Sequence, residues 1–333
     1  MVLIARGGGP GRLLQVHNLP QNKIPDIDVA RELVKDGDFE TLEMLFGEVP
    51  FIFSQLVRTA LIAQYNFIIS DFSAIEARVI AWVAGEQWRL DVFNSHGKIY
   101  EASASQMFKV PIEQISKGSA LRQKGKVAEL ACGYQGGVGA LKAMGATEMG
   151  LCDEELQGLI NEWRSANPNI VKLWQTCEKA ARKAIKEKIV VTIQKGIQFS
   201  YEQGILFIKL PSGRRLAYYN AALTMSDNGR TSITYFGIEQ QSKKWARCDI
   251  YGGKIVENVV QAIARDCLGV AMKRLDANGY KIVLHVHDEV VLDKKNTARD
   301  IKNIDEIMAQ EIEWAPGLHL KGDTFITPFY KKG

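Results

Sequence analysis

The sequence predicts an α+β fold, because strand-like and helical stretches both occur along the chain. An apolar run at 67–69 is typical of a buried strand, and apolar residues with helical spacing follow it. Two β-branched runs within 281–292 flank a short polar segment, which predicts a hairpin. Longer amphipathic stretches at about 168–188 and 256–275 predict helices. The 333 residues, 46% of them hydrophobic, suffice for about two domain-sized lobes.

The net charge, the cysteines and the lengths of the apolar runs indicate which ligands and which cellular compartment the protein is suited to. The net charge of +4 is mildly basic, which is compatible with nucleic-acid binding without demonstrating it. The five cysteines form no Cys-x-x-Cys pair, so we expect free thiols in a reducing compartment and no zinc site. Every apolar run is short or broken by charge, so we expect a cytoplasmic protein without a signal peptide or membrane span.

A carboxylate is expected at the corner between the strand at 67–69 and the helix that follows it. Asp71 comes at the end of the strand, where it could hold a metal ion or act as an ordinary turn residue. Ser73 and Glu76 have the spacing of a capping box, and Gly85 would end the helix. The apolar face of this helix comprises Ile75, Val79, Trp82 and Val83.

The segment 122–134 is expected to be a helix with two cations on one face. Arg122 and Lys126 are four residues apart, and Leu130 and Tyr134 continue that spacing. Two cations on one face suit a polyphosphate, since each can meet a different phosphate oxygen. A solvated basic face without a ligand is the other interpretation of this segment taken alone.

The hairpin predicted at 281–292 has acidic residues at its tight turn. His287, Asp288 and Glu289 lie between the two β-branched runs. Asp288 can also be explained as an ordinary turn residue, with His287 as a hydrogen-bonded neighbour. Together with Asp71, the hairpin gives two carboxylates at strand ends, which is the ligand set of a two-metal phosphoryl-transfer site.

The rest of the chain contributes loops and further elements. Residues 1–25 are expected to form a loop. Asp153 and Asn167 are expected to be the N-caps of two helices. The remaining expected elements are helices at about 28–45 (broken at Gly37), 54–63, 98–108 and 297–314, a turn at 211–213 between two short strands, and a strand at 233–236.

The three stretches, in this order and spacing, resemble motifs A, B and C of family A DNA polymerases, the DNA polymerase I type, and most closely a bacteriophage-like branch. The segment from Asp71 to Arg78 resembles motif A, Arg122 to Tyr134 motif B, and His287 to Glu289 motif C. Gly11-Arg12-Leu13 with Asn18-Leu19-Pro20 resembles the segment that enters the palm. The similarity covers essentially the whole chain.

This resemblance implies a right-hand polymerase architecture, with an antiparallel palm sheet backed by helices and a mainly helical fingers subdomain. The palm would comprise residues 1–95 and 215–333, and the fingers 96–214. We expect a thumb and an exonuclease module to be absent from this chain. A second polypeptide, or an N-terminal segment missing from this sequence, would then supply the thumb. The other implied partners are primer–template DNA and deoxynucleoside triphosphates (dNTPs).

The resemblance also implies catalytic roles. Asp71, the carbonyl of Phe72 and Asp288 would hold two Mg²⁺ ions, which activate the primer 3′-OH and stabilise the leaving pyrophosphate. Lys126 would protonate the leaving group, and Glu289 would support the metal site. These residues make up the expected catalytic set.

Further residues would bind the nucleotide and the DNA. Arg122 and Lys126 would neutralise the triphosphate, and Tyr134 would stack near the templating base. Glu76 would crowd the 2′ position of the sugar and exclude ribonucleotides, with helix capping as the competing explanation. The residues that would contact the DNA are Arg12 and Gln261 in the minor groove and His287 at the primer end.

Four positions depart from the commoner pattern of the family. Leu130 replaces an aromatic residue that contacts the nucleotide sugar, and Tyr100 stands where a histidine usually touches the triphosphate. Ala74 replaces a glutamine, and Gln123 replaces a second arginine. These differences bear on nucleotide affinity and sugar discrimination, and they leave the expected metal ligands intact.

Three functions are compatible with these residues. The first is a template-directed DNA polymerase of phage replication. The second is a truncated, inactive remnant or scaffold that binds DNA weakly, and the third is a single-subunit RNA polymerase. The presence of Asp71, Asp288, Lys126 and Arg122 argues against a remnant, and Glu76 argues against ribonucleotide use.

Overall fold

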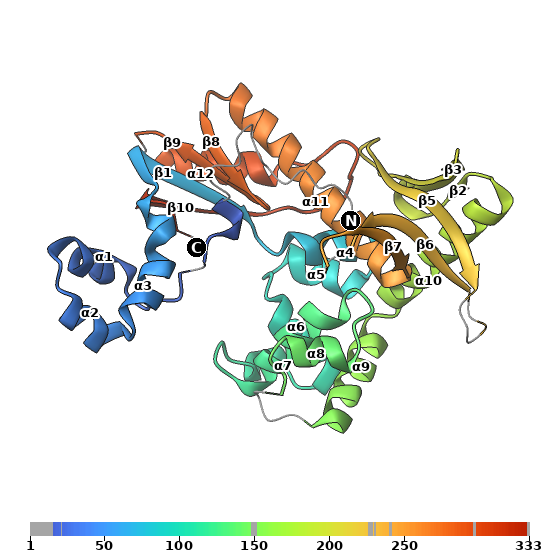
Figure 1. The fold of residues 1–333 in the computed structure, drawn as a ribbon, viewed down its shortest axis with the longest axis horizontal. Coiled ribbons are helices and arrows are strands. Elements are labelled where there is room, and N and C mark those ends of the chain that lie inside the picture. Colours follow the sequence, from blue (N-terminus) through green and yellow to red (C-terminus); the bar gives the residue numbers. More distant parts are fainter. Residues whose placement is uncertain are drawn as a thin grey trace. The chain divides into compact units, whose positions relative to one another are not determined.

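The computed structural model describes residues 16–20, 22–147, 152–225, 229, 231–239, 242–295 and 298–331. They divide into two compact units. The first unit comprises Ala74–Asp266 and Glu311–His319, and the second comprises the described residues up to Ser73, Cys267–Gln310 and those from Leu320 onward. Each unit contains helices and an antiparallel sheet (Figure 1), so the observed fold is α+β, as expected.

The second unit is built on a four-stranded antiparallel sheet in the order β10-β1-β9-β8 (Figure 1). Its strands are β1 (Ile62–Phe72), β8 (Ile282–Val286), β9 (Glu289–Asp293) and β10 (Gly322–Phe329). The predicted hairpin is confirmed, because β8 and β9 pair with Val286 opposite Glu289 and leave a two-residue turn. The strand predicted at 67–69 is also confirmed as part of β1, whereas β10 was not expected from the sequence.

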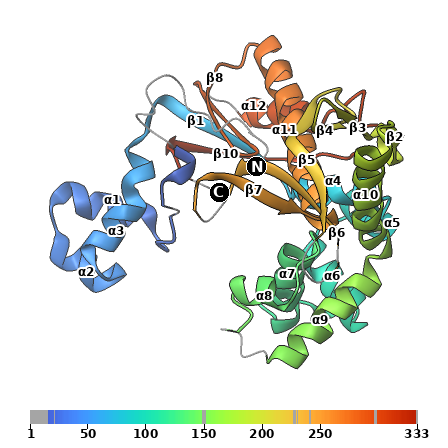
Figure 2. The same cartoon turned by 45° about the vertical axis from the view of Figure 1, so that its right-hand side comes forward.

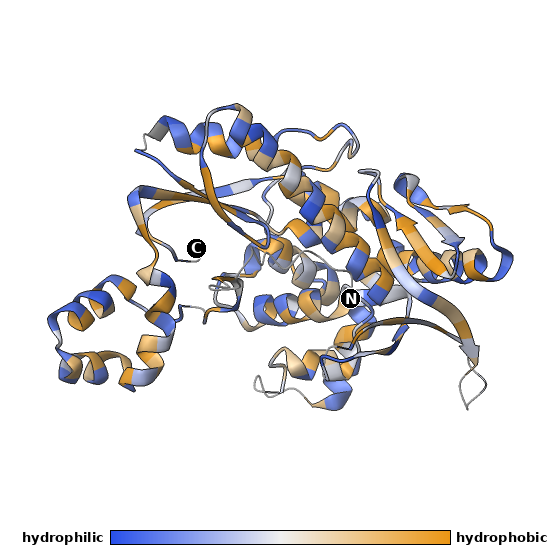
Figure 3. Cartoon of the chain, turned by 45° about the horizontal axis from the view of Figure 1, so that its top comes forward, coloured by the Kyte–Doolittle hydropathy of each residue, from blue (hydrophilic) through white to orange (hydrophobic). Residues whose placement is uncertain are grey.

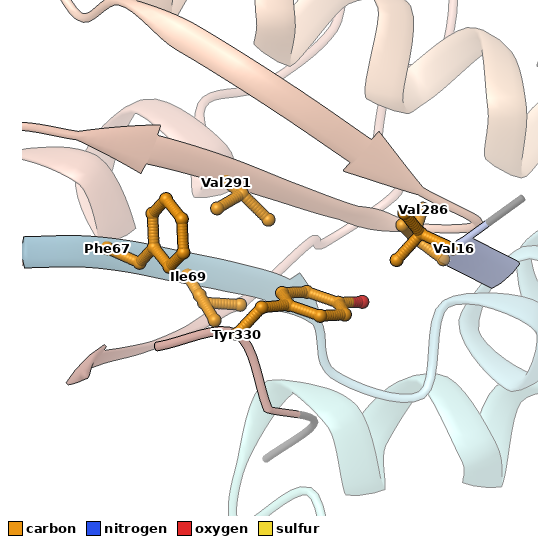
Figure 4. Packing of buried hydrophobic residues seen from close by; sticks show 6 residues of the cluster. All are labelled: Val16, Phe67, Ile69, Val286, Val291 and Tyr330. Carbon is orange, nitrogen blue, oxygen red and sulfur yellow. The ribbon is translucent and has the colours of Figure 1, made fainter. Parts of the chain in front are cut away.

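A core of six buried side chains lies against the sheet of the second unit (Figure 4). Phe67 and Ile69 are two residues apart on β1, so both point to the same face of the sheet. α12 (Ala298–Ala309), shorter than the helix expected at 297–314, contacts β10 and β1. The six core residues are Val16, Phe67, Ile69, Val286, Val291 and Tyr330.

Three short helices precede β1 in the second unit and surround a small core of their own. They are α1 (Ile27–Asp36), α2 (Phe39–Phe46) and α3 (Val49–Leu56). Each carries hydrophobic and hydrophilic bands (Figure 3), as expected of helices buried on one side. The buried residues that they share are Ala30, Leu42, Ile52 and Leu56.

The boundaries of these helices test two sequence predictions. The break at Gly37 is confirmed, since Gly37 has a φ of 74° and ends α1 in the left-handed conformation. The prediction of a helix at 54–63 is wrong, because α3 ends at Leu56 and a 3₁₀ turn (Val57–Ala60) leads into β1. Pairing of Ile62 with Phe329 of β10 extends the strand through residues that local preference assigned to a helix.

The first unit begins with a set of packed helices. Trp163 and Trp174 stack with ring centroids 6.2 Å apart and join two of these helices. The helices are α4 (Ile75–Ala84), α5 (Gln87–Asn94), α6 (Ile99–Phe108), α7 (Ala120–Cys132), α8 (Val138–Ala143), α9 (Asp153–Ala166) and α10 (Pro168–Glu187), with a short 3₁₀ helix at Ile112–Gln114. This arrangement confirms the helices predicted at 98–108, 122–134 and 168–188.

The N-termini of α9 and α10 match the predicted caps only in part. Cys152 rather than Asp153 is the N-cap of α9. The backbone N–H of Cys152 donates a hydrogen bond of 2.9 Å to the carboxylate of Glu155. Asn167 is the N-cap of α10, as expected, although its amide donates a hydrogen bond to the carbonyl of Trp163 instead of capping the helix.

A six-stranded antiparallel sheet in the order β2 to β7 completes the first unit (Figure 2). α10 packs against β2, β3, β4 and β5. The predicted turn at 211–213 and strand at 233–236 are confirmed by β4, β5 and β6. The strands are β2 (Val191–Thr192), β3 (Gln198–Glu202), β4 (Ile205–Lys209), β5 (Arg215–Met225), β6 (Thr231–Ile238) and β7 (Trp245–Ile250), with a 3₁₀ helix at Gln194–Gly196.

The longest helix, α11 (Gly252–Ala277), spans 26 residues and begins four residues before the predicted start. Two glycines at its N-terminus allow close contacts, since a Cβ at Gly252 would lie 2.2 Å from the Trp174 carbonyl and one at Gly253 would lie 2.3 Å from the Tyr134 carbonyl. Within the described ranges, no helix is long and apolar enough to cross a membrane.

Candidate active site

The carboxylates predicted to bind metal lie at one edge of the sheet in the second unit. Asp71 is opposite Glu289 in the pairing of β1 with β9, and the backbone N–H of Phe72 lies 3.4 Å from the carbonyl oxygen of Asp288. The β8–β9 turn consists of His287 and Asp288, and His287 has a φ of 53° in the left-handed region. This turn therefore brings Asp288 next to the end of β1 that carries Asp71 and Phe72.

These residues offer oxygen donors of the kind that Mg²⁺ prefers. Two carboxylates and the Phe72 carbonyl are available, whereas the described residues contain no cluster of three or more His, Cys, Asp or Glu side chains suited to a metal. Protein sites for Mg²⁺ commonly use one or two carboxylates and take their other ligands from water and substrate phosphates. The donor set therefore fits Mg²⁺ bound together with a phosphate substrate.

Glu289 lies on the same sheet face as Asp71, because directly paired residues of antiparallel strands share a face. Its side chain is buried and accepts a hydrogen bond of 2.7 Å from the hydroxyl of Tyr330. Burial, and then the charge of Glu289, raise the pKa of Tyr330 well above its usual value, so this hydroxyl stays protonated and donating. Tyr330 is a residue of this site that sequence reasoning missed, because no motif includes it.

The cations predicted to bind a polyphosphate lie on α7 in the first unit. Ser119 caps the helix by accepting a hydrogen bond of 3.2 Å from the backbone N–H of Arg122. Arg122 and Lys126 are partly exposed, and Leu130 is 48% exposed. The residues that face the interior are Gly125, Val127, Ala128, Ala131 and Cys132. The observed helix thus places Arg122, Lys126 and Leu130 on its outer side.

Glu101 of α6 holds the guanidinium of Arg122. The Nε of Arg122 donates a hydrogen bond of 2.6 Å to Oε1 of Glu101, and its guanidinium carbon lies 5.5 Å from the ring centroid of Tyr100. Among the residues that the structure describes, no group accepts a hydrogen bond from the two terminal nitrogens of Arg122. The pair thus orients the guanidinium and leaves its terminal N–H groups available to an anion.

A buried acid fixes the inner side of α7. Glu129 pairs bidentately with Arg89 of α5, and it also accepts hydrogen bonds from Ser103 (2.7 Å) and the indole of Trp163 (2.9 Å). Arg89 donates a further bond of 3.0 Å to Asn167. These contacts join α5, α6 and α9 to α7, so they set the rotation of the helix that carries Arg122 and Lys126.

Tyr134 and Glu76 are hydrogen-bonded within the first unit. The Tyr134 hydroxyl donates to Oε2 of Glu76 at 2.6 Å. Burial, and then the charge of Glu76, raise the pKa of Tyr134 well above its usual value. The capping box expected from Ser73 is wrong, because Ala74 is the N-cap of α4, with a left-handed φ of 51°, and no side chain caps the helix. The contact of Glu76 that the structure establishes is the hydrogen bond from Tyr134.

The predicted site residues thus fall into two groups, each described within its own unit. The second unit brings together Asp71, Phe72, His287, Asp288 and Glu289. The first unit holds Glu76, Tyr100, Arg122, Lys126, Leu130, Tyr134 and, on α11, the half-buried Gln261. Arg12 and the segment 11–13 lie outside the described residues.

Comparison with known proteins identifies the family to which this chain belongs. The sequence model of "DNA polymerase family A" matches residues 49–326. The chain belongs to DNA polymerase family A. It is 59% identical to the DNA polymerase of Bacillus phage SP02 over 329 residues, which are 98% of this chain and 51% of that protein. It is 24% identical to DNA polymerase I of Pseudomonas aeruginosa over 246 residues, 71% of this chain and 22% of that protein.

A solved structure has a similar fold. It is the POL domain of Pol1 from M. smegmatis in complex with DNA primer-template and dNTP, with a TM-score of 0.56 and 18% identity, covering 83% of this chain and 42% of that one. The resemblance drawn from motifs A, B and C is confirmed at the level of the family and of its phage-like branch. The chain spans about half the length of the phage relative.

Proposed function

We propose that this chain is the catalytic part of a template-directed DNA polymerase, which adds deoxynucleotides to a primer 3′-OH in phage DNA replication. The observation that carries the proposal is the juxtaposition of the Asp71 and Asp288 segments at one sheet edge. Membership of family A and the names of the relatives support it. In this proposal, residues 1–95 and 215–333 form the palm, and 96–214 form the fingers.

Asp71, the Phe72 carbonyl and Asp288 would hold two Mg²⁺ ions. When bound, the metals lower the pKa of the primer hydroxyl and offset charge on the leaving pyrophosphate. The protein's part is to fix these oxygen ligands on β1 and in the β8–β9 turn. Glu289, held by Tyr330, would keep a negative charge beside Asp71 and so raise the affinity of the edge for cations.

Arg122 and Lys126 would bind the triphosphate, because the orientation imposed by Glu101 leaves the terminal nitrogens of Arg122 available to phosphate oxygens. Lys126 would also give a proton to the leaving pyrophosphate. Tyr100 and Leu130 would line the nucleotide site, and Tyr134 would stack near the templating base. Arg12, Gln261 and His287 would contact the primer–template.

Glu76 would select the sugar. Its carboxylate is fixed by Tyr134, so it cannot easily move away from a 2′-hydroxyl. The N-cap of α4 is Ala74 rather than Ser73, so the capping-box spacing does not account for Glu76, whereas its bond to Tyr134 supports a role at the nucleotide site. Glu76 therefore favours deoxynucleotides over ribonucleotides and distinguishes this proposal from an RNA polymerase.

Primer extension by the purified chain tests the proposed function. With Mg²⁺ and a primed template we expect extension with dNTPs and little with ribonucleotides. Extension with ribonucleotides alone would favour an RNA polymerase, and no extension under any condition would favour an inactive scaffold. Repeating the assay with the half of the SP02 polymerase that lies outside the match, supplied as a separate polypeptide, tests whether a second chain is required.

A further inference from the structure

The six-stranded sheet of the first unit has one buried and one solvent-facing side. Along β4 and β5, buried and outward residues alternate, as expected of a strand covered on one face. The buried side includes Leu206, Ile208, Leu216, Tyr218, Ile233 and Tyr235. The outward side of the same strands carries aromatic rings and cations, which hydrophobic burial does not explain.

Two aromatic rings on this outward side are largely exposed. Tyr219 of β5 is 56% exposed and Trp245 of β7 is 62% exposed, and their ring centroids are 6.4 Å apart. Single exposed rings are ordinary on protein surfaces, but two neighbouring ones expose a combined apolar area. β6 lies between β5 and β7, and its Phe236 pairs with Tyr219 on one side and with Arg247 on the other.

Cations are interleaved with these rings. The guanidinium of Arg247 lies 4.5 Å from the ring centroid of Phe236, and its Nη1 donates a hydrogen bond of 2.7 Å to Thr234. Arg215 lies 4.2 Å from the ring centroid of Phe207 and 3.5 Å from Glu202. Stacked guanidinium groups of this kind keep N–H edges available for phosphate oxygens.

The segment that contains this sheet carries an excess of positive charge. Residues 188–251, which include β2 to β7, contain nine lysines and arginines and four aspartates and glutamates. The segment therefore carries a net charge of +5, whereas the whole chain carries +4. The remaining residues sum to −1, so the segment 188–251 has a net attraction for a polyanion that the rest of the chain, taken as a sum, lacks.

We propose that the outward side of β4–β7 binds single-stranded DNA, with Tyr219 and Trp245 stacking on unpaired bases and Arg215 and Arg247 contacting phosphates. Exposed rings interleaved with cations are the combination used to bind single strands without sequence preference. A duplex hides the faces of its bases inside the stack, so it can use the cations but not the rings. Single-stranded DNA is thus the ligand that uses both sets of residues; if the proposed polymerase function holds, that ligand is the unpaired template strand.

Binding of fluorescently labelled oligothymidine, of about 20 nucleotides, tests this proposal. Anisotropy titrations compare the wild type with Tyr219→Ala and Trp245→Ala, with a blunt duplex of matched length as the second ligand. Each variant is expected to weaken oligothymidine binding about fivefold to a hundredfold, the range of one base–ring stack. Binding of the duplex should change little.

Two further variants control for side effects. Phe51→Ala removes an equally exposed ring on α3 of the second unit and should leave oligothymidine binding unchanged. Trp245→Phe keeps a stacking ring and should retain most of the affinity even if Trp245→Ala is less stable. Arg247→Gln should reduce oligothymidine binding. It should also make the slope of log K against log salt concentration shallower, by the amount expected for about one phosphate contact.

The proposal is overturned if both ring variants bind oligothymidine as the wild type does. It is equally overturned if they weaken oligothymidine and duplex binding alike, because the rings would then act on something other than unpaired bases. The assay needs no catalysis, so its outcome is independent of whether the chain extends primers.

Discussion

The hydroxyl of Tyr134 donates a hydrogen bond of 2.6 Å to the carboxylate of Glu76, joining the segment that follows α7 to the first turn of α4. Both residues belong to segments that the sequence predicted to act on the nucleotide. The bond holds one carboxylate oxygen of Glu76 in place, and the protonated phenol remains its donor because the pKa of Tyr134 is raised.

This pair yields the first prediction. Glu76→Ala should increase the kcat/KM for ribonucleotides relative to deoxynucleotides by about one order of magnitude or more, since the space beside the sugar opens. Tyr134→Phe should increase this ratio less, because the Glu76 side chain remains and loses only the hydrogen bond from the Tyr134 hydroxyl. Single-nucleotide incorporation measures both. A variant that loses thermal stability while keeping its sugar preference would show that the pair is structural.

Glu101 supplies the second prediction, because it orients Arg122 through Nε. Glu101→Ala should raise the KM for dNTPs about tenfold with little change in kcat, as expected for loss of binding energy shared by ground and transition states. Glu101→Gln keeps an acceptor and should have a smaller effect. A lower KM in either variant would mean that Glu101 competes with the triphosphate for Arg122 instead of orienting it.

The buried pair of Arg89 and Glu129 supplies the third prediction. Glu129→Gln or Arg89→Met leaves one charge buried without its partner, so each should lower the free energy of unfolding by about 3–5 kcal/mol. The double variant Arg89→Met/Glu129→Leu should recover part of that loss. Denaturant titration measures the differences, with Lys302→Ala as the control, since its pair with Glu306 is exposed and should contribute less than ~1 kcal/mol. Equal effects of the buried and exposed changes would contradict this account.

Buried tyrosines supply the fourth prediction. Burial is the main cause that raises the pKa of Tyr134, Tyr218 and Tyr330, and it raises that of Tyr235 to about 12. Because the folded-state values exceed those of the unfolded chain, these phenols stabilise the fold fully below about pH 10, and that contribution is lost as pH rises through the folded-state values. The free energy of unfolding should therefore fall above about pH 10. Phenolate absorbance that saturates while circular dichroism stays native would contradict this.

The sequence predicted the parts of the site that depend on local pattern. The strand before Asp71, the turn at Asp288 and the outward positions of Arg122 and Lys126 follow from alternation or helical spacing, and the structure has all of them. The capping role of Ser73 failed because the chain makes a left-handed turn at Ala74, which delays the helix start by one residue. Spacing alone does not reveal such a turn at an alanine.

Contacts between segments that are far apart in the sequence could not be predicted from local residue patterns. Glu129 is bound by Arg89, 40 residues earlier, and Glu289 by Tyr330, 41 residues later. The only sequence signal for Glu129 was an acidic residue among small apolar ones on the inner side of the helix at 122–134. The outward side of β4–β7 was missed because β7 was not predicted, so its cations and rings could not be placed on one face.

Primer extension by Asp71→Asn and Asp288→Asn, each in Mg²⁺, tests the central claim most directly. Each substitution removes a charged oxygen ligand from the proposed metal site while keeping the size of the side chain. We predict that each reduces the rate of nucleotide addition by several orders of magnitude, with circular dichroism unchanged. Extension by either variant at a rate near that of the wild type would contradict the assignment of this sheet edge as the catalytic centre.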